Sequence, residues 1–155
     1  MPLFRKYAPA ATTCPERRQL VKKYLPMVIE EHCSEIKARL RDCQFSLIVD
    51  ESPELGGQPA INILAVFYCE KDSSNKILLL SSSALNQCNA ASVLLLVQQT
   101  VCVYNMQWTN CVGILSDSAK YMQWLAKDLQ ALYPNVLHIP CIAHLVNVSV
   151  NTAVT

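Results

Sequence analysis

The chain has 155 residues, 52% of them apolar, and a formal net charge of +1. It can bury the core of one domain, and its charge balance creates no global field toward nucleic acid or anionic membranes. No apolar run reaches the ~20 residues that a helix needs to cross a bilayer. We therefore expect a soluble, intracellular protein that meets a membrane only through a partner, and no small-molecule substrate.

The cysteines indicate the redox compartment. All eight are scattered, mostly inside apolar runs, without the spacing of a disulfide framework. The first residues, Met-Pro-Leu-Phe-Arg-Lys-Tyr, hold no apolar signal core. We expect free thiols in a reducing compartment.

Basic residues concentrate near the start of the chain. Residues 1–42 hold nine Lys and Arg against five acids, whereas the remainder holds four against seven. Such residues are either solvated helix faces or a surface that contacts phosphates. The residues proposed for nucleic-acid binding are Arg17, Arg18, Lys22 and Lys23.

Residues 1–12 are expected to be a loose tail. A helix is predicted to begin at Pro15 and to break near Pro26, where a second helix takes over from Met27. The apolar face of the second helix comprises Val28, Ile29, His32, Ile36 and Leu40.

Strand patterns begin after these helices. The segments 43–50, 61–69 and 77–82 are joined by short turns, which predicts an antiparallel meander. Helices and strands then alternate, with strands at about 110–116 and 136–140 and a last helix after them. The order β-β-β-α-β-α-β-α predicts a mixed α/β sheet, three antiparallel strands plus two parallel ones, with helices on both faces. This is the order of a ribonuclease H-like fold, in which the first strand is central.

Two of the predicted strands end in an aspartate. Phe-Ser-Leu-Ile-Val runs into Asp50, and Cys-Val-Gly-Ile-Leu-Ser runs into Asp117. If the two strands are parallel neighbours, both carboxylates emerge at one edge of the sheet, close enough to share a divalent ion. Carboxylate oxygens suit Mg²⁺ or Mn²⁺, and such ions support phosphodiester chemistry.

Plainer interpretations of the two acids stay open. Asp50 could simply end its strand and accept hydrogen bonds in the turn at Ser52. Asp117 or Ser118 could be the N-cap of the following helix, a contribution of ~1 kcal/mol. Glu51 is not expected to be a further ligand, because successive side chains on a strand point to opposite faces.

A second group of reactive residues follows the last predicted strand. Cys141 and His144 have the i, i+3 spacing that places both on one helix face. A closed zinc site needs four ligands, and no second pair of this kind is present. The pair is either a buried thiol with a packed histidine, or a group in which His144 orients a phosphate or a carboxylate.

Three segments together resemble a known family. SLIVDES, CVGILSDSAKYM and LYPNVLHIPCIAHLVNVSV occur in this order and are similar to the catalytic core of hAT-superfamily DNA transposases, including their domesticated vertebrate descendants. The resemblance covers about residues 15–155. It implies a ribonuclease H-like core in which Asp50 and Asp117 match the first two acids of a DDE metal site. Cys141 and His144 match the C-x-x-H element beside that site. The family cuts and rejoins DNA with Mg²⁺ or Mn²⁺, which implies a nuclear location.

The chain departs from the family pattern in one chemical respect. The third acid of the family is a glutamate that follows a large helical insertion, whereas no Asp or Glu follows Asp128 here. The BED-type zinc finger and the segment linked to dimerisation are also missing. We expect residues 1–42 to be a tail with basic helices and residues 43–155 to be a partial, truncated transposase core.

Three functional hypotheses follow. The first is a transposase-derived domain, catalytically incomplete, that binds DNA or a protein and holds a divalent ion weakly. The second is a metal-dependent nuclease or strand-transfer enzyme completed by a carboxylate from another chain. The third is a protein-interaction module that uses exposed apolar surface on the last helix, for a partner or for self-association. Residues that would form this surface are Ile142, Leu145, Val146, Val148 and Val150.

Overall fold

A computed structural model describes residues 15–53 and 59–153. The chain divides into two compact units, Met1–Ala38 and Arg39–Thr155. The first unit is helical where it is described. It contains α2 (Arg17–Gln19), the π-helical turn η1 (Leu20–Tyr24) and most of α3 (Leu25–Leu40). The expected tail at 1–12 lies outside the described residues.

The helix break predicted near Pro26 is wrong. Pro26 is the second residue of α3, and helical backbone runs without interruption from Arg17 to Leu40. Proline cannot donate the usual i→i−4 hydrogen bond, which normally kinks a helix. The π-helical turn η1 directly precedes it, and a π-turn changes the hydrogen-bond partners locally. The wider π-helical turn before Pro26 therefore lets the helix continue through the proline.

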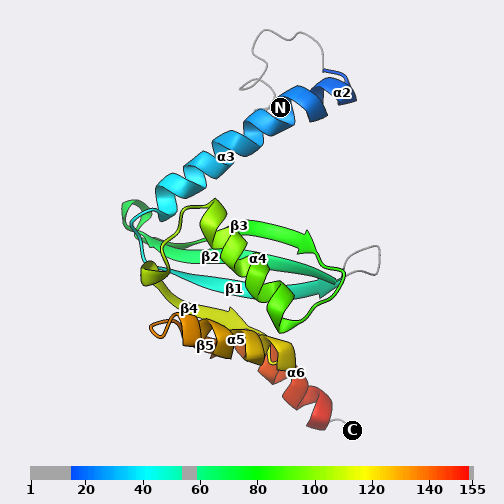
Figure 1. Cartoon of the computed structure of the whole chain (residues 1–155), viewed down its shortest axis with the longest axis vertical. Helices are drawn as coiled ribbons and strands as arrows, with labels where there is room; N and C mark the ends of the chain where they lie inside the picture. The colour runs from blue at the N-terminus through cyan, green and yellow to red at the C-terminus, as the bar shows by residue number, and fades with distance from the viewer. Residues whose placement is uncertain (1–14, 54–58, 154–155) are drawn as a thin grey trace. The chain divides into compact units, whose positions relative to one another are not determined.

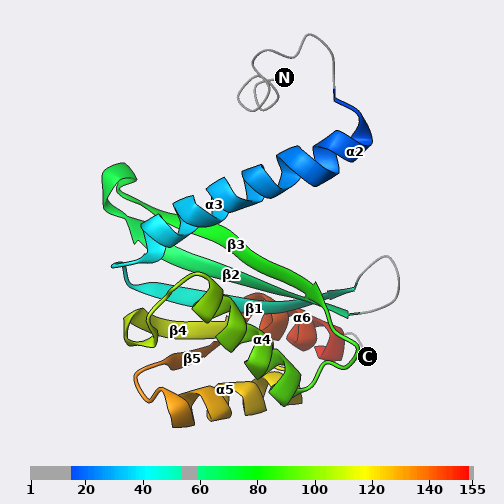
Figure 2. The ribbon, with the colours of Figure 1, turned by 45° about the horizontal axis from the view of Figure 1, so that its top comes forward.

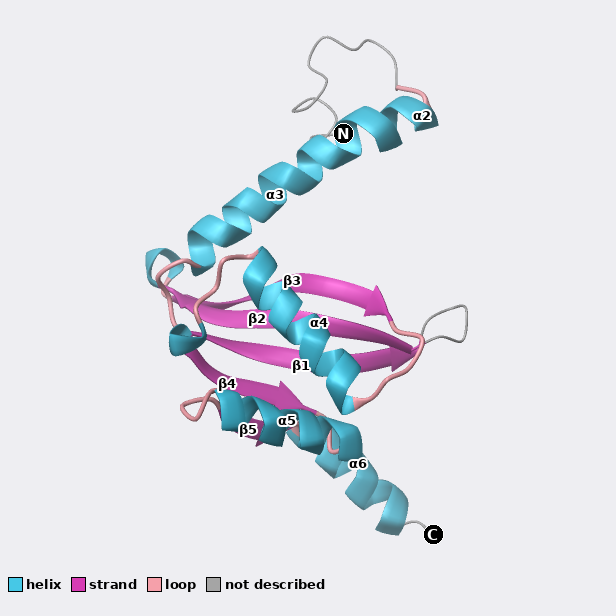
Figure 3. Ribbon diagram, in the orientation of Figure 1, coloured by secondary structure: helices cyan, strands magenta, loops and turns pink. Residues whose placement is uncertain are grey.

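The second unit is built on a five-stranded mixed sheet with the order β3-β2-β1-β4-β5 (Figures 1 and 3). Strands β3, β2 and β1 are antiparallel, and β1, β4 and β5 are parallel. The strand bounds are β1 Phe45–Pro53, β2 Pro59–Cys69, β3 Ser74–Ala84, β4 Cys111–Ser116 and β5 Leu137–Pro140. The predicted fold class is confirmed: the meander, the two parallel strands and the central β1 form a ribonuclease H-like sheet.

Three helices accompany the sheet: α4 (Ala90–Val103), α5 (Lys120–Leu132) and α6 (Ile142–Ala153). Figure 2 shows α4 and α5 together on one face, whereas α6 lies behind the sheet. The right-handed crossovers through α4 and α5 place these two helices on one face, and α6, which follows β5, lies on the other. Among the described helices, none is both long and apolar enough to cross a membrane.

The core fills the space between the sheet and the pair α4 and α5. Strand β1 alternates, with Phe45, Leu47 and Val49 buried and the residues between them half-exposed. Facing residues on the helices are Val93, Val97, Val101, Met122, Leu125 and Leu129. Burial of each such side chain contributes about 1.5–3 kcal/mol, so this layer fixes the sheet register.

Two polar contacts fix α4 at its ends. Asn89 forms a capping box with Ser92, in which each side chain accepts a hydrogen bond from the other's backbone N–H. At the other end, the buried Tyr104 hydroxyl donates to the Leu80 carbonyl of β3, 3.0 Å away. These contacts define the first turn of α4 and tie the residue that follows its last turn to β3.

Candidate functional site

Asp50 and Asp117 occupy equivalent places on neighbouring parallel strands. Val49 of β1 pairs with Ser116 of β4, and each aspartate is the next residue. Neighbouring strands lie about 4.8 Å apart, so the backbones that carry the two acids reach the same edge of the sheet side by side. Both residues are half-buried. The backbone arrangement is the one that a shared cation would need.

The alternation of β1 separates Asp50 from the helical core. Val49 is fully buried beneath the helices, and Asp50 comes directly after it, so its side chain leaves from the opposite face. Asn62 is its register partner on β2. The Asn62 amide donates to the Ser52 hydroxyl, 2.9 Å away. Polar side chains therefore border Asp50 along this edge.

Asp117 is held by its own turn. Its Oδ1 accepts a hydrogen bond from the Ala119 N–H at 3.0 Å. The N-cap of α5 is Ala119 and makes no side-chain cap bond, so the prediction that Asp117 or Ser118 caps this helix is wrong. The reason is that the chain makes an Asx-type turn before the helix begins. One carboxylate oxygen is used in that turn, and the second is left for another ligand.

The start of α6 is attached to the same strand end. The Cys141 N–H donates to the Ser116 carbonyl at 2.7 Å, which places the first turn of α6 next to Asp117. The side-chain hydrogen bond with His144, followed by backbone N–H groups of the first helical turn, lowers the pKa of Cys141. The same thiol is the main cause that raises the pKa of His144, and the charges of Asp50 and Asp117 raise it further. His144 therefore stands within electrostatic reach of both acids.

Glu51 belongs to the other face, as the alternation predicts. Its carboxylate accepts a hydrogen bond from the Tyr121 hydroxyl in the first turn of α5. Burial and this carboxylate raise the pKa of Tyr121, so the phenol stays a proton donor. Glu51 thus anchors α5 to the end of β1, and sequence reasoning missed Tyr121 because the partners are 70 residues apart.

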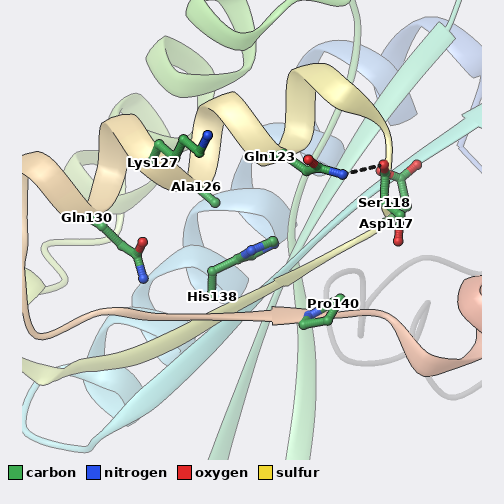
Figure 4. A pocket seen from close by; sticks show the side chains of 8 residues that line it. All are labelled: Asp117, Ser118, Gln123, Ala126, Lys127, Gln130, His138 and Pro140. Carbon is green, nitrogen blue, oxygen red and sulfur yellow. Dashed lines mark hydrogen bonds between the residues drawn. The ribbon is translucent and has the colours of Figure 1, made fainter.

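A cavity of about 310 Å³ lies between α5 and β5, with Asp117 among its lining residues (Figure 4). His138 lines it from β5, and its Nε2 is 3.0 Å from the Ser116 hydroxyl. Burial lowers the pKa of His138, which favours the neutral imidazole. On the helix side, Gln123 donates to the Ser118 carbonyl at 3.0 Å. No sequence pattern marks His138, because a lone histidine in a short strand has no distinctive spacing.

The carboxylates of Asp50 and Asp117 supply some of the oxygen ligands that a hard divalent cation needs. Two aspartates at the ends of neighbouring parallel strands would supply oxygen ligands, and Mg²⁺ commonly takes one or two carboxylates with water or phosphate completing its shell. The described part of the chain contains no group of three or more His, Cys, Asp or Glu residues that could hold a metal ion. Asp50 and Asp117 would therefore hold an ion as a pair, with most positions left to other ligands.

The basic residues belong to the other unit. Arg17 and Arg18 lie in α2, and Lys22 and Lys23 lie in η1, all exposed. The Lys23 ammonium stands 5.6 Å from the centre of the neighbouring Tyr24 ring. The four basic residues together form an exposed basic segment within two helical turns.

The last helix exposes apolar side chains. Ile142 is 71% exposed, Val146 56% and Val150 55%, and Leu145 is also exposed. The Val148 side chain lies outside the described part of the structure. Exposed apolar residues in one short helix are a feature of surfaces that meet another molecule.

Comparison with known proteins adds little to this picture. No protein-family model matches the chain, and no curated protein matches it. Among solved structures, the chain is similar to the catalytic core domain of the HTLV-2 integrase, in complex with magnesium and in a dimeric form. The TM-score is 0.40 and the identity 10%, over 72% of this chain and 69% of that chain. The fold class rests on the strand order of this chain.

Proposed function

We propose that this chain is a transposase-derived domain of the hAT type that binds DNA or a protein and lacks a complete catalytic site of its own. The observation that carries the proposal is the register of β1 and β4, which brings Asp50 and Asp117 to one sheet edge. The start of α6, with Cys141 and His144, is tied to the same edge. The resemblance of the three sequence segments to that family supplies the DNA-processing context and a nuclear location.

Within this proposal, Asp50 and Asp117 hold a divalent ion weakly. A bound Mg²⁺ or Mn²⁺ would polarise a phosphodiester and activate a water or hydroxyl. Asp117 is oriented by its bond to Ala119. His144, exposed beside both acids, orients a phosphate group. In this proposal Asp50 and Asp117 are the first two acids of a DDE set.

A metal titration tests the site. Mn²⁺ is added to the whole chain while its melting temperature is followed, and Asp50→Asn is compared with Asp128→Asn, an exposed acid on α5. We expect a rise of a few degrees that Asp50→Asn removes and Asp128→Asn keeps, since ligand binding stabilises the folded state. An equal response of both variants would contradict the metal site.

DNA retention tests the binding role. Neutralising the four basic residues of α2 and η1 to Gln should weaken salt-dependent retention of duplex DNA, because each phosphate contact releases counterions. A matched variant neutralises Lys71, Lys76, Lys120 and Lys127 instead, the bases outside residues 1–42. If both variants lose retention equally, the basic segment is not the DNA-binding surface. Nicking of plasmid DNA in Mn²⁺ that Asp50→Asn abolishes would favour the enzyme completed by another chain.

The exposed apolar face of α6 favours a second candidate, a protein-interaction role. If that face is covered by another molecule in the functional state, Val146→Lys should reduce self-association seen by sedimentation. Sedimentation of the unmodified chain as a monomer at all concentrations would exclude self-association as the explanation.

A further inference from the structure

Cys43 and Cys69 lie just beyond the last residue pair that joins the first two strands. Strands β1 and β2 are antiparallel, with Phe45 paired to Phe67. Continued two residues beyond this pair, the register would bring Cys43, in the connection before β1, opposite Cys69. Directly opposed residues of an antiparallel pair have Cα atoms about 4.5 or 5.5 Å apart. Disulfides span Cα distances of about 4.4–6.8 Å, so two cysteines opposed in this way would be within reach of a disulfide bond.

The faces of the two strands agree with that pairing. Phe45 and Phe67 are both buried, and Tyr68, between Phe67 and Cys69, is 55% exposed. Alternation therefore turns Cys69 to the same face as Phe67. Cys43 lies in the connection between α3 and β1, two residues before that strand. Both cysteines are half-buried free thiols, so small oxidants can reach them.

The electrostatic influence of Cys69 on Cys43 agrees with this placement. Burial is the main cause that raises the pKa of Cys43, and the charges of Asp42 and Cys69 raise it further. In the reduced state the Cys43 thiol donates to the Arg39 carbonyl, 3.3 Å away. This exposed contact to the carbonyl of a residue four positions earlier is weak.

We propose that Cys43 and Cys69 are a redox site that forms a reversible disulfide between the 41–44 connection and the end of β2. With oxidised glutathione as the oxidant, one protein thiolate attacks its disulfide and releases one glutathione thiol. The second protein thiolate then attacks the mixed disulfide and releases the other. Two protein thiols become one disulfide, and two molecules of reduced glutathione carry away the electrons and protons.

The bond would tie the connection that leads into β1 to the strand beside it. Figure 2 shows this connection and the β2–β3 turn at the same end of the sheet, opposite the end where β1 delivers Asp50. The closed loop contains all of β1. Closing a loop of that length restricts the unfolded chain, so oxidation should raise the melting temperature by about 5–10 °C.

The sequence permits a direct test. Trypsin cuts after Arg41 and Lys71, and no Lys or Arg lies between them, so one peptide, Asp42–Lys71, contains both cysteines. The whole chain is equilibrated with oxidised glutathione, blocked with iodoacetamide and digested. We expect this peptide to carry no alkyl group, to have lost two hydrogens, and to regain two alkylation sites after reduction. Cleavage after Glu51 then leaves two fragments joined only by the disulfide.

Two variants and a control make the result specific. Cys43→Ser and Cys69→Ser should each leave one alkylated or glutathionylated cysteine in that peptide and remove the rise in melting temperature. Cys102→Ser, at an exposed cysteine on α4, should keep both effects. The proposal is overturned if the unmodified chain, under the same oxidant, shows two alkylated cysteines or a glutathione on each. It is also overturned if Cys43 or Cys69 pairs with a different cysteine.

Discussion

The Tyr121 hydroxyl donates a hydrogen bond to the Glu51 carboxylate and so joins the first turn of α5 to the end of β1. The contact lies on the helical face of the sheet, whereas Asp50, the preceding residue, leaves from the other face. One strand end therefore serves two purposes. Glu51 fixes α5, and Asp50 is available at the site edge.

Tyr121→Phe removes this hydrogen bond and should destabilise the chain by about 1 kcal/mol at pH 7. Burial raises the pKa of Tyr121 above its ordinary value of about 10. The folded chain then keeps the phenol proton to higher pH than the unfolded chain. The contribution to stability is complete below about pH 10 and is lost as the pH rises toward the folded pKa.

Urea unfolding at about pH 8 and about pH 11 checks whether the contribution of Tyr121 to stability falls as the pH rises. The difference in stability between the unmodified chain and Tyr121→Phe should shrink at the higher pH. Tyr68→Phe, at an exposed tyrosine of β2, is the matched control and should show no such change. A difference that grows with pH would contradict the assignment.

Cys141 should react faster than an ordinary thiol. Its pKa is lowered by the hydrogen bond with His144 and by backbone N–H groups at the start of α6. The midpoint of iodoacetamide alkylation should therefore lie below the usual value of about 8.5. His144→Ala should move that midpoint upward, measured by mass spectrometry across a pH series. Alkylation of Cys102 in the same samples should be unaffected by the variant.

Neighbouring carboxylates repel each other when no cation lies between them. Asp50→Asn should therefore stabilise the chain in the presence of a chelator by about 0.5 kcal/mol, and the gain should shrink at high salt. Asp128→Asn serves as the control, because this acid is exposed on α5. Loss of stability in Asp50→Asn under these conditions would mean that the carboxylate has a structural partner.

Leu47→Ala should be among the most damaging single changes. Leu47 is fully buried in the middle of the central strand, so its loss leaves a cavity and should cost about 2–5 kcal/mol. Leu79→Ala removes the same atoms from a leucine of β3 that is 53% exposed, and should change stability by less than about 0.5 kcal/mol. Urea denaturation of both variants gives the comparison.

Local patterns predicted most of the fold. The strand segments, their short turns and the order of strands and helices depend on residues a few positions apart, and the sequence shows these directly. The predicted helix break at Pro26 is wrong because the preceding π-helical turn lets the helix continue through this residue. Tyr121 and His138 were missed because their contacts, with Glu51 and Ser116, join strands and helices far apart in the chain. Such contacts leave no periodic signal.

The central place of β1 also has a consequence for the order of folding. Its partner β2 follows after a short connection, whereas β4 begins at Cys111, after β3 and α4 have been completed. Closing a longer stretch of chain is entropically costlier and slower. We expect the β1–β2–β3 meander to be an early nucleus and the β1–β4 pairing to close late. The two acids would then meet as one of the last events, so mutations near Ser116 should accelerate unfolding more than they slow refolding.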